Sequence, residues 1–173
     1  MTYSSPANGP GGLQHIEQMF LDLPKRSDLS SLLHRVLDEA IKVAGADKGT
    51  LQRLDEKSGC LKIVASRGFA AEFLKYFETV HPHSNTTCAA ALMRRMRVVV
   101  DDVSTSYLFV GTPELDIMRS VNVAAAHSTP IISRSGRLWG VVTTHFHHMQ
   151  APDRYDPTLL DRLAVNLADH FER

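Results

Sequence analysis

Two cysteines and nine histidines are the residues of this chain best suited to chemistry. Cys88 has the most pointed position, because it follows Thr86 and Thr87 and precedes a helix-prone run. The N-terminus of a helix lowers the pKa of a thiol, so one interpretation is a reactive or sensing cysteine. The other interpretation is a small apolar residue that fills a contact between a helix and a sheet. Cys60, the second cysteine, belongs to a distant predicted strand.

Four histidines gather near the end of the chain: His127, His145, His147 and His148. Side chains alternate along a strand, so His145 and His147 share one face and His148 lies on the other. Imidazoles from neighbouring strands can hold a metal ion or a haem. The alternative is one core histidine, fixed by a backbone hydrogen bond, with solvent-facing neighbours. We favour this alternative, so we predict no metal site and do not expect a haem.

These histidines lie on a predicted β-hairpin. The runs Ala124–Ser133 and Leu138–Phe146 are apolar or β-branched, and Arg134-Ser135-Gly136 forms the turn between them. A first hairpin is predicted from Gly49–Leu54 and Cys60–Ala65, and a short strand from 98–100.

Apolar residues at steps of three and four predict helices around these strands. The clearest is Leu29–Ala44, with Ser27 or Asp28 as its cap and Gly45 as its stop. Further helices are predicted over 13–23, 70–80, 88–96, 112–120 and from Asp156 to the C-terminus. Strands joined in hairpins with helices at both ends predict an α+β fold, in which helices pack on a central antiparallel sheet.

Composition indicates one domain, residues 13–173, after a flexible leader, residues 1–12, which is rich in proline, glycine and serine. Lysine plus arginine equals aspartate plus glutamate, 19 each, so we expect neither nucleic acid nor an anionic membrane as partner. Two cysteines make no disulfide framework, and no apolar run approaches the ~20 residues that span a bilayer. We therefore predict a cytoplasmic protein.

Several segments together resemble the GAF domain family, in particular the subgroup found beside bacterial sensor histidine kinases. The resemblance covers roughly Leu29 to Phe171. The segments that carry it are Lys62–Phe69, Thr87–Leu92, Arg97–Val103, Ser128–Gly136 and Gly140–Phe146. The chain departs from the family at Ala89, where glycine is common after the cysteine.

The resemblance implies terminal helices on one face of the sheet and, on the other face, a small-molecule pocket formed by short helices and loops. Tyr107 and Phe109 would form an aromatic lid, or else would anchor a long loop in the core. The candidate ligand-binding residues are Cys88, Tyr107, Phe109, His127, Thr129, Thr144 and His145.

Other activities of the family leave no signature here. The Asn-Lys…Phe…Asp-Glu pattern of cyclic-nucleotide binding and the chromophore-attaching cysteine of bilin binding are both missing from the sequence. Relatives that reduce free methionine sulfoxide use several cysteines near Cys88. The phosphoacceptor helix and ATP-binding domain of a kinase are absent from this sequence. The cofactor is therefore unknown, and we expect no enzyme activity.

We thus predict a sensory domain that binds an unidentified small molecule and relays its occupancy through the terminal helices to a histidine kinase or another output module. The apolar stripes of those helices could also pair two copies into a homodimer, or could pack only on their own sheet. Two alternatives stay open: a redox-active protein or enzyme that uses Cys88, and a dimerisation module without a ligand.

Overall fold

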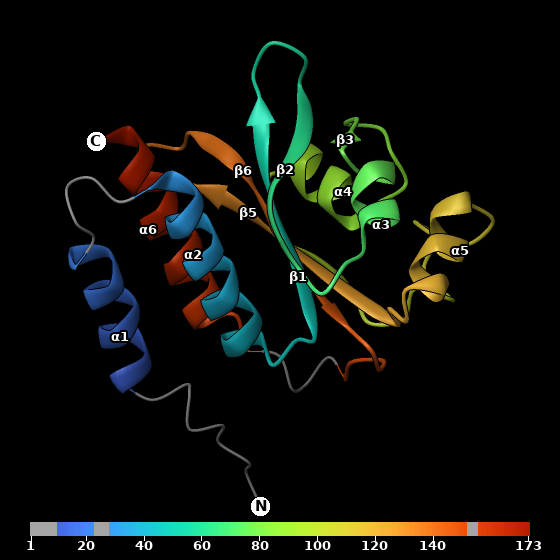
Figure 1. The fold of residues 1–173 in the computed structure, drawn as a ribbon, viewed down its shortest axis with the longest axis horizontal. Helices are drawn as coiled ribbons and strands as arrows, with labels where there is room; N and C mark the ends of the chain where they lie inside the picture. Colours follow the sequence, from blue (N-terminus) through green and yellow to red (C-terminus); the bar gives the residue numbers. More distant parts are fainter. Residues whose placement is uncertain (1–9, 23–27, 152–155) are drawn as a thin grey trace, which may run out of the picture.

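Six strands form one antiparallel sheet in the order β3–β2–β1–β6–β5–β4 (Figure 1). The structure, a computed structural model, describes residues 10–22, 28–151 and 156–173. The long strands β1, β2, β5 and β6 make the two predicted hairpins, and β1 pairs with β6 to join them. The strands are β1 (Lys48–Asp55), β2 (Cys60–Arg67), β3 (Thr79–Val80), β4 (Val98–Val100), β5 (Ala125–Ile132) and β6 (Leu138–Phe146).

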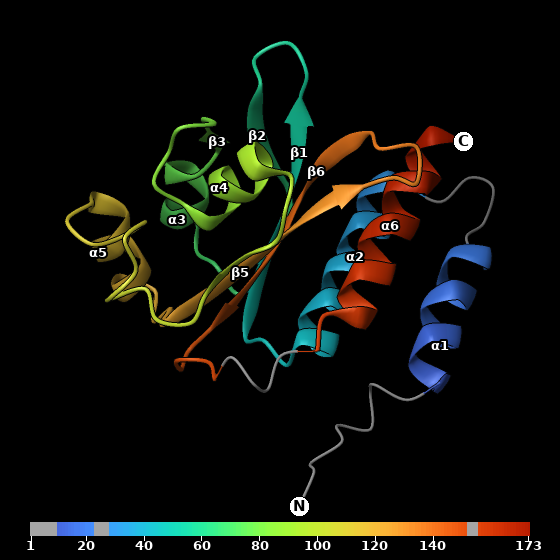
Figure 2. The ribbon, with the colours of Figure 1, turned by 180° about the vertical axis from the view of Figure 1, so that it is seen from behind.

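Helices cover both faces of this sheet (Figures 1 and 2). On one face lie the terminal helices α1 (Pro10–Leu21), α2 (Leu29–Ala44) and α6 (Thr158–Glu172). On the other lie the short helices α3 (Ala71–Tyr76), α4 (Thr87–Arg94) and α5 (Pro113–Ser120). The predicted α+β architecture is confirmed.

Local chemistry sets the ends of α2 as the sequence predicts. The side chain of Asp28 caps the helix by accepting a hydrogen bond from the backbone N–H of Ser30. Gly45 ends it in the left-handed region at φ 64°, a conformation that glycine adopts at little steric cost. The residues buried against the sheet are Leu32, Leu33, Val36, Leu37 and Ala40.

Strand alternation sends neighbouring residues of the central strands into two separate cores. Leu51 and Val142 pack under the terminal helices, whereas Val141 packs under the short helices. Each central strand therefore contacts both layers, and its residues on the second face surround the candidate site.

Two element boundaries differ from the sequence prediction. Helix α1 begins at Pro10, inside the predicted leader, because proline's fixed φ suits a first helical turn; residues 1–9 of that leader lie outside the described residues. The predicted helix over 70–80 is too long: α3 ends at Tyr76, and Thr79–Val80 forms β3. Val80, a β-branched residue, pairs there with Leu61 of β2, and this pairing gives the segment its strand conformation.

In the described ranges, no helix combines the length and the apolar character needed to cross a membrane.

Candidate functional site

A small cavity lies between the second face of the sheet and the layer that contains α3, α4 and α5. The space in it that is open to the centre of a water molecule is about 20 Å³. A water molecule needs about 10–15 Å³ by that measure, so the cavity has room for a water or for a molecule of a few heavy atoms. Its lining residues are Thr50, Gln52, Ile63, Phe73, Phe77, Thr86, Thr87, Cys88, Phe109, Met118, Thr143 and His145.

Two polar atoms in this lining lack a hydrogen-bond partner among the described residues: Gln52 Oε1 and His145 Nδ1. Gln52 is 2% exposed and His145 is 4% exposed. A buried polar atom without a partner costs roughly 1–3 kcal/mol, and native proteins contain few of them. Both atoms thus mark the cavity as a place where a bound group can supply hydrogen bonds.

His145 is held in its neutral form. Burial lowers its pKa to about 3, and the positive charge of Lys48 acts in the same direction. Aromatic rings surround the imidazole: its ring centre lies 4.9 Å from that of Phe69 and 6.3 Å from that of Phe73, both in edge-on geometry. A neutral imidazole fixed in this way offers one donor and one acceptor rather than a charge.

Hydroxyl groups connect α4 to the sheet beside the cavity. Ser128 Oγ donates to Thr87 Oγ1 at 2.8 Å and lies 2.7 Å from Thr143 Oγ1. The Thr86 side chain caps α4 by accepting from the backbone N–H of Ala89 at 3.2 Å. These bonds fix the beginning of α4 over β5 and β6.

Cys88 lines the cavity at the start of α4, as the sequence predicts, but its environment favours the packing interpretation. Burial raises the pKa of the thiol, although the Thr86 hydroxyl, 3.2 Å from Sγ, nearby backbone N–H groups and the side chain of Gln52 act in the opposite direction. A thiol held protonated in this way is a weak nucleophile. Cys60 lies elsewhere, with its Sγ 3.2 Å from Nδ1 of His81.

The structure brings together three of the seven candidate residues: Cys88, Phe109 and His145. Phe109 is fully buried and packs in the core of this face, so it serves as an anchor of its loop. Tyr107 is 73% exposed, and its hydroxyl accepts a hydrogen bond from Arg94 at 2.5 Å. Of the two alternatives for this pair, the structure favours the loop anchor for Phe109, and Tyr107 does not line the cavity.

The other three candidates, His127, Thr129 and Thr144, do not line the cavity. His127 pairs across the sheet with Thr144, and residues at paired positions share a face. That face is opposite to the one that His145 occupies, one residue along β6. The prediction that His127, Thr129 and Thr144 share a ligand site with His145 is corrected by this register.

Each of these three side chains has a structural contact. His127 Nε2 lies 3.1 Å from Asp101 Oδ1, and Thr129 Oγ1 accepts from Arg97 at 3.2 Å. Thr144 Oγ1 donates to the carbonyl of His127 at 3.4 Å. Burial lowers the pKa of His127, and Asp101 opposes that shift. In the described part of the chain, no three His, Cys, Asp or Glu residues come close enough to form a metal site.

Sequence reasoning missed the polar residues that β1 contributes, Thr50 and Gln52, and also Thr143 of β6. Thr50 pairs directly with Thr143, and Gln52 pairs with Val141. Polar residues at alternate positions of a strand normally indicate a solvent-exposed face. The available signal was the family resemblance, since a sheet with helices on both faces buries both sides of β1.

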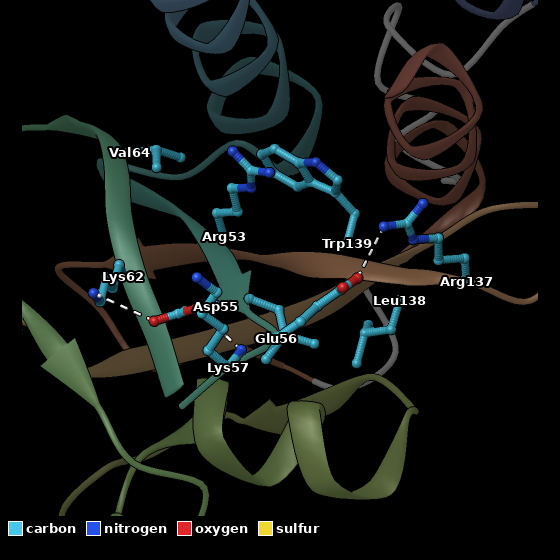
Figure 3. Close-up of a pocket in the computed structure, with 10 residues that line it drawn as sticks. Arg53, Asp55, Glu56, Lys57, Lys62, Val64, Arg137, Leu138 and Trp139 are labelled. Atoms are coloured by element: carbon cyan, nitrogen blue, oxygen red, sulfur yellow. Dashed lines mark hydrogen bonds and ion pairs between the residues drawn. The ribbon is translucent and has the colours of Figure 1, made fainter. Parts of the chain in front are cut away.

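A larger concavity lies at the end of the β1–β2 hairpin, where two pairs of opposite charge form among its lining residues (Figure 3). Its volume is about 440 Å³ by the same measure, and it is open to solvent. Lys62 lies 3.4 Å from Asp55, and Arg137 donates to Glu56 at 2.9 Å. Because these pairs are exposed and mutually satisfied, the smaller buried cavity is the better candidate site.

Comparison with known proteins agrees with the resemblance to the GAF domain family that the sequence shows. The GAF domain profile matches residues 26–172, which is most of the chain. No curated protein gives a significant match.

Solved structures share the fold at low sequence identity. A domain of a putative two-component sensor histidine kinase from Sinorhizobium meliloti is 18% identical, with a TM-score of 0.68 over 86% of this chain and 93% of that one. The GAF domain of an Acinetobacter phosphoenolpyruvate-protein phosphotransferase is 15% identical, with a TM-score of 0.73 over 94% and 91%. Free methionine-R-sulfoxide reductase from Neisseria meningitidis is 21% identical, with a TM-score of 0.70 over 92% and 86%. By its profile and its fold, this chain belongs to the GAF domain family.

Proposed function

We propose that this chain is a sensory domain of bacterial signal transduction that binds a small molecule in the cavity between β1, β6 and α4. The observation that carries this proposal is the pair of buried atoms, Gln52 Oε1 and His145 Nδ1, that line the cavity without a partner. Such atoms are costly unless a bound group satisfies them.

The two central strands supply a route from the cavity to the terminal helices. Thr50 and Gln52 line the cavity, while Leu51 between them packs in the core under α2 and α6. A ligand that shifts β1 therefore acts on both layers, and the terminal helices would carry the change to an output module. A sensor histidine kinase is one such module, in keeping with the Sinorhizobium meliloti structure. We place this activity in the cytoplasm, since both cysteines are free.

We propose a binding role rather than an enzymatic one. The free methionine-R-sulfoxide reductases among the similar structures favour a redox alternative that uses Cys88. The buried thiol with its raised pKa argues against that alternative, and Cys60 does not line the cavity. A dimerisation module without a ligand is the remaining alternative, and it leaves the two unpartnered atoms unexplained.

Native mass spectrometry of the freshly purified chain tests the proposal. The wild-type chain should retain a small molecule at one per protomer. Thr50→Ile extends a cavity-lining side chain into the space and should abolish that extra mass. Thr79→Ile makes the same change at an exposed position of β3 and should keep it. The same result for the wild type and Thr50→Ile, whether the extra mass is present on both or absent from both, would contradict the proposal.

A further inference from the structure

We propose that the cavity selects a small uncharged molecule that donates hydrogen bonds, such as a primary amide, and discriminates against anions and cations of the same shape. This inference rests on the proposed function and specifies its ligand. It follows from which atoms the lining offers and from which charges it lacks.

The cavity offers an acceptor that only a donor can satisfy. Gln52 is more than nine-tenths buried, and its Oε1 atom has no partner among the described residues. His145 is buried to a similar degree, and its Nδ1 is also unpartnered. A carboxylate has only acceptor oxygens, so it cannot satisfy Gln52 Oε1, and it would bury its charge in a lining that contains no Lys or Arg. A ligand that satisfies Gln52 Oε1 carries at least one N–H or O–H group.

The lining contains no Asp, Glu, Lys or Arg, and Lys48, whose charge acts on His145, donates to the carbonyl of Val121 at 2.7 Å. A cationic donor such as an amidinium would satisfy Gln52 Oε1, but it would lose its hydration without meeting a carboxylate. The burial of an unpaired charge costs far more than the burial of a neutral amide that is hydrogen-bonded. The imidazole of His145 is neutral as well, since burial lowers its pKa to about 3.

One element of the wall would by itself favour an anion: the N-terminus of α4, where Thr86, Thr87 and Cys88 line the cavity. Its donors are engaged by the chain itself. Thr86 Oγ1 accepts from the N–H of Ala89, and backbone N–H groups of the first turn lie against the thiol of Cys88. The apolar remainder of the wall, Phe73, Phe77 and Phe109 among others, suits an uncharged molecule.

Three probes of one shape and different charge separate these possibilities: acetamide, acetate and acetamidinium. Each has four non-hydrogen atoms. Binding is followed by NMR titration of the full ¹⁵N-labelled chain, with the ring nitrogens of His145 as the reporter of binding inside the cavity. We expect acetamide to shift these signals saturably, with a dissociation constant at least tenfold lower than that of either charged probe.

Gln52→Glu gives a second readout, since it replaces the amide by a carboxyl group of the same size. It should improve the affinity for acetamidinium relative to acetamide by at least tenfold. Gln14→Glu, at an exposed position of α1, should leave the wild-type order unchanged. If Gln52→Glu does not fold, the wild-type titration decides the matter by itself.

The possible failures are distinguishable. If acetate or acetamidinium shifts the His145 signals with an affinity equal to that of acetamide, the ligand class is wrong and the cavity stands as a binding site. If none of the three probes shifts them, both the ligand class and the proposed function are overturned.

Discussion

At the scale of single residues, His145 makes stability depend on pH. Its pKa in the folded chain is about 3, below the ordinary value of 6.5. Between these two pH values, the unfolded chain therefore binds a proton at His145 and the folded chain does not. The contribution of neutral, buried His145 to the free energy of unfolding is fully present above pH ~6.5 and is lost as the pH falls toward 3. Between pH 7 and pH 5, the free energy of unfolding should fall by about 2 kcal/mol from this residue.

Urea unfolding of His145→Gln at both pH values measures this contribution. The variant should lose most of that pH-dependent difference, although His127, whose pKa is also lowered, retains a share. His148→Gln, at an exposed position, is the control and should behave as the wild type does. An unchanged difference in His145→Gln would show that the imidazole is not buried in its neutral form.

Gly140 is required by close packing between strands. A Cβ atom at this position would lie 2.0 Å from the backbone oxygen of Gln52, and a backbone atom cannot move aside locally. Gly140→Ala should lower the free energy of unfolding by about 3 kcal/mol or more and disturb β1 beside the cavity. A Cβ atom at Gly49 would instead meet side-chain atoms of Ile41 and Leu37, at 2.9 Å, which can move more easily than a backbone atom, so Gly49→Ala should cost less. Thermal unfolding of the two variants measures which loss of stability is larger. A smaller loss for Gly140→Ala than for Gly49→Ala would contradict the prediction.

The sequence predicted the cavity residues unevenly. Cys88 and His145 were predicted because thiol and imidazole groups can react or bind ligands. Gln52 was missed because a polar residue in a strand is taken to face solvent, an inference that fails when helices cover both faces of the sheet. His127 and Thr144 were misplaced because their side depends on the register between β5 and β6, which sequence spacing does not specify.

At the scale of elements, the Ser128 hydroxyl is expected to hold α4 on the sheet. Ser128→Ala removes the partner of the buried hydroxyls of Thr87 and Thr143 and should cost about 1–3 kcal/mol. Thr87→Val should cost a similar amount. The double variant should cost about 1 kcal/mol less than the sum, because each single change leaves a partner unsatisfied. Additive effects in urea unfolding would mean that these hydroxyls do not act together.

Most elements could be predicted because their signals are local. The cap and stop of α2, the glycine turn between β5 and β6 and the proline at the start of α5 each specify a boundary within a few residues. Strand β3 could not be predicted in this way. Its two residues follow a helical apolar pattern, and they become a strand through pairing with β2.

At the scale of the whole molecule, α1 should stabilise the domain by packing on α6. Ile16, Met19 and Phe20 are buried in the core under the terminal helices, and the Phe20 ring lies 6.3 Å from that of His170. Phe20→Ala should lower the free energy of unfolding by about 3 kcal/mol. Leu21→Ala, at a residue that is 73% exposed, should change it by less than about 0.5 kcal/mol. Equal, small effects in thermal unfolding would mean that α1 does not dock.

The burial of Ile16, Met19 and Phe20 within one chain affects the predicted homodimer. The apolar residues of α1 that were expected to pair two copies pack on α6 of their own chain. A homodimer through the terminal helices stays a prediction, and it would have to use other residues of these helices.

An experimental structure of the freshly purified chain, at a resolution that shows ordered water, tests the ligand cavity most directly. We expect density for a bound molecule larger than water within hydrogen-bonding distance of Gln52 Oε1 and His145 Nδ1. A dry cavity, a lone water, or side chains of Gln52 and His145 that satisfy each other would contradict the assignment of this cavity as the sensory site.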